Sequence, residues 1–145
     1  MNFKKLKKLT IGAMACACLM TTTIPACAKN YPYEFTFKNT ADTVTKPWVK
    51  KTDNAQKWYL SIDKVNQETG KNNTLSSTNI FGCKIHKKGS KKDVDVYHTF
   101  SNYVSGYGMK YKVKVKKNSQ MALAGKKDNT STSSKTLKVS GRYAP

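Results

Sequence analysis

The stretch Gly106-Tyr107-Gly108-Met109-Lys110-Tyr111-Lys112-Val113-Lys114-Val115-Lys116-Lys117 alternates apolar and polar residues. Every second position from Tyr107 to Val115 is apolar, and the positions between are filled by one glycine and then by lysines. Because successive side chains of a strand point to opposite faces, the pattern predicts a strand from Tyr107 to Val115 with one apolar and one lysine-bearing face. The apolar face predicts a core that other segments must cover.

Similar alternation recurs along the rest of the chain. It predicts strands over residues 31–37, 58–62, 80–85, 94–100 and 137–143, with a further strand around Met121 and Leu123. A short extended piece at Pro47-Trp48-Val49 is expected to place Trp48 in the core. No window has a helical period. The predicted fold is therefore all-β, an antiparallel β-sandwich or small barrel of about seven to eight short strands.

The first 28 residues have the pattern of a secretory signal peptide. Four lysines between residues 4 and 8 precede an apolar run over residues 9–20, and Ala26-Cys27-Ala28 has the small-x-small pattern of a cleavage site. The run of about a dozen residues is too short for a membrane-spanning helix. We therefore expect a secreted protein whose mature part is one β-sandwich domain over residues 29–145.

A lipoprotein signal is the alternative for the same segment. Ile24-Pro25-Ala26-Cys27 would then place a lipid on Cys27 and anchor the protein instead of releasing it. Pro25 suits this motif poorly, and Ala28 provides an ordinary cleavage site. Lipid anchoring at Cys27 is therefore the second expectation.

Cleavage would leave a strongly basic chain without disulfides. Cys83 is the one cysteine beyond residue 28, so the fold must be held by its hydrophobic core. Four of the 27 basic residues leave with the signal peptide, and the remaining 23 face 8 acidic residues, a formal charge of +15. Such an imbalance predicts attraction to polyanions, although it carries no information about the fold.

The motifs for catalysis or metal binding are weak. Cys83 and His86 form C-x-x-H, but residues three apart on a strand point to opposite faces, and one cysteine with two histidines falls short of four zinc ligands. A Cys83–His98 nucleophile and base has no supporting motif around it. Asp93 and Asp95 could contribute to a calcium site, but local charge balance with neighbouring lysines explains these two carboxylates better. We expect no enzyme activity, cofactor or metal.

The lysines are the better candidates for function. If the last strand neighbours the ribbon, one surface holds Lys110, Lys112, Lys114, Lys116, Lys138 and Arg142. A second cluster holds Lys84, Lys87, Lys88, Lys91 and Lys92. A solvated face that blocks edge-to-edge aggregation would explain one cluster but not the whole charge excess. The expected partner is an anionic polymer or an anionic membrane surface, whereas export makes nucleic acid less expected.

A resemblance supports the same class of protein. The chain resembles small secreted proteins of Gram-positive bacteria that have no established activity. The shared marks are Lys4-Lys5-Leu6-Lys7-Lys8, Pro47-Trp48 followed by Lys50, the strand around Trp58 to Ile62, and Val139-Ser140-Gly141 with an aromatic residue two positions on. Its layout is similar to that of lactococcin-like bacteriocins. The resemblance implies a β-sandwich and, as an alternative to envelope binding, an antimicrobial role against competing Gram-positive cells. It implies no functional residues.

Overall fold

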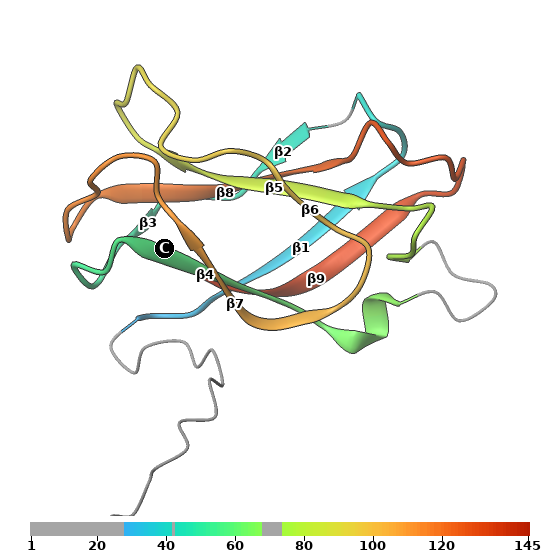
Figure 1. Cartoon of the computed structure of the whole chain (residues 1–145), viewed down its shortest axis with the longest axis horizontal. Coiled ribbons are helices and arrows are strands. Elements are labelled where there is room, and N and C mark those ends of the chain that lie inside the picture. The colour runs from blue at the N-terminus through green and yellow to red at the C-terminus, as the bar shows by residue number, and fades with distance from the viewer. Residues whose placement is uncertain (1–27, 42, 68–73) are drawn as a thin grey trace, which may run out of the picture.

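Two antiparallel β-sheets pack face to face in the computed structural model of the chain, which describes residues 28–41, 43–67 and 74–145 (Figure 1). The predicted all-β sandwich is confirmed. Nine strands form it, one more than the upper expectation, and the two sheets do not close into a barrel. The expected signal peptide, apart from Ala28, and the alternative lipid site at Cys27 lie outside the described residues.

The first sheet has four strands in the order β1-β9-β4-β7. They are β1 (Tyr31–Phe37), β9 (Leu137–Ala144), β4 (Lys57–Ile62) and β7 (Val104–Lys110). The last strand, β9, therefore pairs along its whole length with β1 and on its other side with β4. It does not neighbour β7, the strand that contains Lys110.

The second sheet has the order β2-β8-β5-β6, and β3 also pairs with β8. Its strands are β2 (Thr43–Thr45), β3 (Val49–Lys50), β5 (Phe81–Lys87), β6 (His98–Phe100) and β8 (Gln120–Lys127). The helical content of the described residues is one 3-10 turn, η1 (Lys64–Asn66). None of these residues forms a helix with the length and apolar character needed to cross a bilayer.

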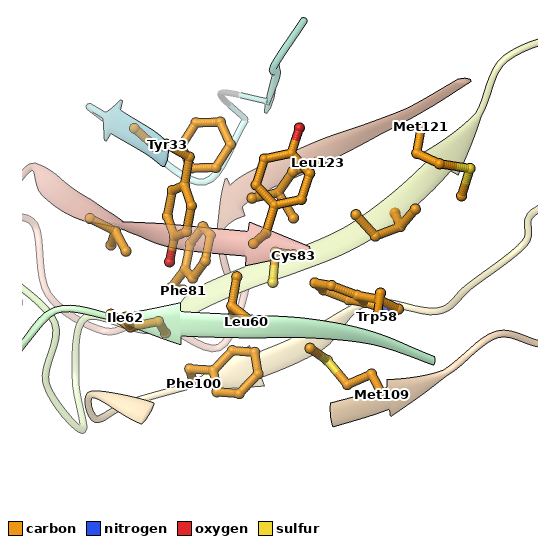
Figure 2. Packing of buried hydrophobic residues seen from close by; sticks show 14 of the residues in the cluster. Tyr33, Trp58, Leu60, Ile62, Phe81, Cys83, Phe100, Met109, Met121 and Leu123 are labelled. Atoms are coloured by element: carbon orange, nitrogen blue, oxygen red, sulfur yellow. The ribbon is translucent and has the colours of Figure 1, made fainter. Parts of the chain in front are cut away.

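Aromatic and aliphatic side chains fill the space between the sheets, as the alternation predicts. Buried Tyr33, Phe35 and Phe37 of β1 alternate with exposed residues. Figure 2 shows side chains of both sheets meeting in this core, among them Trp58, Leu60 and Ile62 of β4, Phe81 and Cys83 of β5, and Leu123 of β8. Burial of these side chains is the main favourable contribution to folding.

The predicted strand from Tyr107 to Val115 is wrong in its second half. β7 begins at Val104 and ends at Lys110, and residues 111–119 form an irregular connection to β8. Of the predicted apolar face, Met109, Tyr111 and Val115 are buried, but Tyr107 is 50% exposed and Val113 is 42% exposed. The chain leaves the ladder because residues of the connection before β4 bind its backbone. Gln56 binds the backbone of Tyr111 and Val115, and Asn54 binds that of Lys117.

Two other expectations differ from the structure. Trp48 is 43% exposed instead of lying in the core. The strand expected over residues 94–100 is shortened to β6, because Asp95 turns inward and its carboxylate accepts a hydrogen bond from the backbone N–H of Ile85 at 3.3 Å. This side chain takes the place that a strand backbone would have occupied beside β5.

Candidate functional site

Three connections meet at one end of the sandwich, at the left of Figure 1. They are residues 51–56 between β3 and β4, residues 88–97 between β5 and β6, and residues 111–119 between β7 and β8. Backbone hydrogen bonds of 2.9 Å tie them to one another: Lys51 N–H to Ser119 O, Lys88 N–H to Gln120 O, and Lys112 N–H to Val94 O. Segments far apart in the sequence therefore form one continuous surface.

This end of the molecule gathers ten exposed lysines. They are Lys50, Lys57, Lys88, Lys91, Lys92, Lys110, Lys112, Lys114, Lys116 and Lys117. We call the surface that these ten residues form the basic end. Two of them, Lys57 of β4 and Lys110 of β7, are direct cross-strand partners. Like charges placed opposite one another are destabilising, so an anion bound between them would relieve repulsion.

The aspartates of these connections already have other partners. Asp53 forms an ion pair of 2.6 Å with Lys51, which is fully buried, and Asp95 lies 3.0 Å from His98. Asp93 pairs at 3.2 Å with Lys84. None of these contacts involves a lysine of the basic end. The positive charge of that surface is therefore not neutralised by the aspartates beside it.

Gln56 holds the connection that carries four of the ten lysines. Its side-chain amide donates to Val115 O and accepts from Val115 N–H, both at 2.9 Å, as a paired strand would. Lys117 N–H donates to Asn54 Oδ1 at 3.2 Å. With Tyr111 and Val115 buried beneath, the lysines between and after them project into solvent.

Four of the six predicted binding residues belong to this surface. Lys110, Lys112, Lys114 and Lys116 all lie at the basic end, although three of them are in the connection and not on a strand face. Sequence reasoning missed Lys50, Lys57 and Lys117 as members. Strand pairing places Lys50 and Lys57 beside the others, whereas Lys117 directly follows Lys116 in the sequence.

The structure separates the other two predicted residues from this group. Arg142 and Lys138 are exposed on β9, and Lys138 is paired with Thr36 of β1. At about 3.3 Å per residue, Lys138 lies about 13 Å beyond Arg142 and farther from the basic end. β4 also lies between β9 and β7. The expected continuation of one surface through the last strand is therefore not what the structure shows.

The second predicted lysine cluster divides between two places. Lys88, Lys91 and Lys92 are exposed at the basic end. Lys84 instead lies on the second sheet with its ammonium 4.9 Å from the centroid of the Tyr97 ring, which Lys126 approaches to 4.8 Å. These two cation–π contacts give Tyr97 a structural role there.

Cys83 is placed for packing and not for reactivity. It is fully buried on the core face of β5, and His86 belongs to the opposite face. Burial, and secondarily the charge of Asp95, raises the pKa of the Cys83 thiol well above its usual value. His98, its cross-strand partner, is bound to Asp95. Among the described residues, no group of three or more His, Cys, Asp or Glu side chains could hold a metal ion.

This burial predicts an unreactive thiol. In the chain from Lys29 to Pro145, Cys83 should react with a thiol-specific reagent at pH 8 at least about a hundredfold more slowly than in denaturant, since the thiolate is the reactive form. Absorbance during labelling with a chromogenic disulfide measures both rates. Equal rates in native and denaturing buffer would contradict the buried placement.

Comparison with known proteins does not place the chain in a family: no family, no curated protein and no solved structure matches it. The resemblance to lactococcin-like bacteriocins, and the antimicrobial role that it implies, stay predictions.

Proposed function

We propose that the protein is secreted, has no catalytic activity and binds an anionic component of the cell envelope or its surroundings through the basic end. The observation that carries this proposal is the convergence of ten exposed lysines from separate segments on one surface. A random distribution of lysines would serve solubility equally well. Gathering them at one end costs electrostatic repulsion, which an anionic partner offsets.

The basic residues of the basic end are all lysines. This supports a partner that is recognised by its density of negative charge and not by the geometry of one carboxylate or phosphate group. Arg142 is the only arginine of the chain, and it lies outside the basic end. Lysine ammonium groups act as mobile point charges, whereas arginine is suited to bidentate recognition of individual carboxylates or phosphates. Binding should therefore depend strongly on salt and tolerate variation in the partner.

Two double variants test which surface binds. Lys114→Gln/Lys116→Gln removes two charges from the basic end, and Lys138→Gln/Arg142→Gln removes two from β9. With about 1 kcal/mol for each cation near an anionic surface, we expect the first variant to lose about 30-fold in affinity. Immobilised polyphosphate and vesicles containing phosphatidylglycerol, each titrated with salt, provide the measurements.

The β9 variant is the matched control because it removes the same charge from exposed positions. We expect it to lose less than about threefold. Equal losses would mean that only net charge matters and would contradict a localised site. If the wild-type chain binds neither polyphosphate nor anionic vesicles at low salt, the proposed function is wrong.

A further inference from the structure

We infer that the anionic partner of the basic end is a lipid bilayer, which the molecule approaches end-on with Val113 and Trp48 at the headgroup level. This inference rests on the proposed function and goes further by choosing a surface over a polymer chain. Two features of the basic end support the choice: the spread of its lysines and its exposed apolar side chains.

The lysines spread in two dimensions. They come from two connections, residues 88–97 and 111–119, and from the ends of three strands, so they do not follow one line along the chain. A single polymer chain would contact only those along its path. A charged plane contacts all of them at once, and lysines near an anionic leaflet contribute roughly independently to binding.

Exposed apolar side chains accompany the lysines. Val113 is 42% exposed between Lys112 and Lys114, with the two flanking apolar residues buried beneath it. Trp48 is 43% exposed two residues before Lys50. Tryptophan is favoured at the boundary between water and hydrocarbon, and lysines can lay their methylene chains along that boundary while their ammonium groups stay in water. Neither apolar residue assists binding to a soluble polyanion.

The test enlarges the apolar contact without changing charge. Val113→Trp, in the chain from Lys29 to Pro145 that contains all nine strands, should bind vesicles of phosphatidylglycerol and phosphatidylcholine about fivefold more tightly than the parent. Its added fluorescence should shift to the blue and be quenched by brominated lipid. Its affinity for soluble polyphosphate should stay within about twofold of the parent.

Val65→Trp is the matched control. Val65 is 79% exposed in η1, which lies at the other end of the sandwich (Figure 1). We expect no gain in vesicle affinity and no quenching of the introduced side chain. If both variants gain equally, the end-on orientation is overturned.

Different binding results would overturn the bilayer inference and the proposed function. Binding of the parent chain to polyphosphate without binding to anionic vesicles would overturn the bilayer inference and leave the proposed function in place. Absence of binding to both would overturn both. Vesicle binding in which Val113→Trp is neither tighter nor quenched would show that this end does not contact lipid.

Discussion

Replacing Gly141 by alanine should lower the free energy of unfolding by about 3 kcal/mol or more, the largest effect expected for a single methyl group in this chain. Gly141 lies within β9, paired with Tyr33 of β1 and Ile62 of β4. An added Cβ would overlap the backbone carbonyl oxygen of Ser61 and lie 2.9 Å from the Tyr33 hydroxyl. Because the first of these atoms belongs to a backbone, the overlap can be relieved only by moving β4 away from β9.

The same substitution at Gly82 provides the control. A Cβ at Gly82 of β5 would meet side-chain atoms of Lys126 and Asp128 at 3.4 Å, which flexible side chains can accommodate. We expect a change of less than about 1 kcal/mol there. Chemical denaturation followed by far-ultraviolet circular dichroism measures both. Similar losses at the two positions would contradict the close approach of β4 and β9 at Gly141.

Replacing Gln56 by leucine should lower the free energy of unfolding by about 2 kcal/mol and loosen residues 111–117. The substitution removes both side-chain hydrogen bonds to the backbone of Val115 and a third, of 2.7 Å, to Asn54 O. Val115 is fully buried, so its N–H and C=O would lose their partners in a place that water reaches poorly. The lysines of this connection would stay in the chain but lose their fixed positions.

Hydrogen exchange and binding distinguish this loss from a general destabilisation. The Val115 amide should exchange at least tenfold faster in Gln56→Leu. The protection of the β9 amides should change only as much as the global free energy of unfolding changes. Gln67→Leu is the control, because among the described residues the Gln67 side chain donates to the exposed Asn102 side chain, at 3.2 Å, and not to buried backbone. Unchanged exchange at Val115 would show that Gln56 does not hold the connection.

Much of the core could be predicted because its pattern is local. In β1, β4 and β9 the apolar residues alternate without interruption, and each alternation coincides with burial in the structure. The aromatic content of β1 made its inward face especially clear: Tyr33, Phe35 and Phe37 contact one another and Phe81 of the other sheet. Strand pattern and burial agree in these three strands, whereas in β7 the residue Tyr107 is paired with Leu60 and is still 50% exposed.

The strand predictions from alternation were wrong where a side chain, and not a neighbouring strand, forms hydrogen bonds with the backbone. Residues 111–115 keep the period of β7, but Gln56 binds the backbone at Val115, and no ladder exists there. Asp95 similarly ends the expected strand before β6 by binding Ile85 N–H. A polar residue that pairs with distant backbone leaves no periodic signal, so neither departure could be read from the local pattern.

The candidate site could likewise be predicted only where its residues are close in the sequence. The run from Lys110 to Lys116 was visible as a lysine repeat, and four predicted residues do lie together. The assignment of Lys138 and Arg142 to the same surface depended on β9 neighbouring β7, whereas β4 lies between them. Strand order is a property of the whole chain, and it decides which loops share an end.

The position of the two ends of the described sandwich bears on how the protein could be attached. Lys29 N–H donates to Thr52 Oγ1 at 3.1 Å, and Ala144 pairs with Tyr59 near the start of β4, so both termini of the sandwich lie beside the basic end. A lipid on Cys27, two residues before Lys29, would therefore tether the molecule with its lysines toward the membrane. A purification tag at either terminus would shield them. Tethered and released forms would thus present the same end to a bilayer.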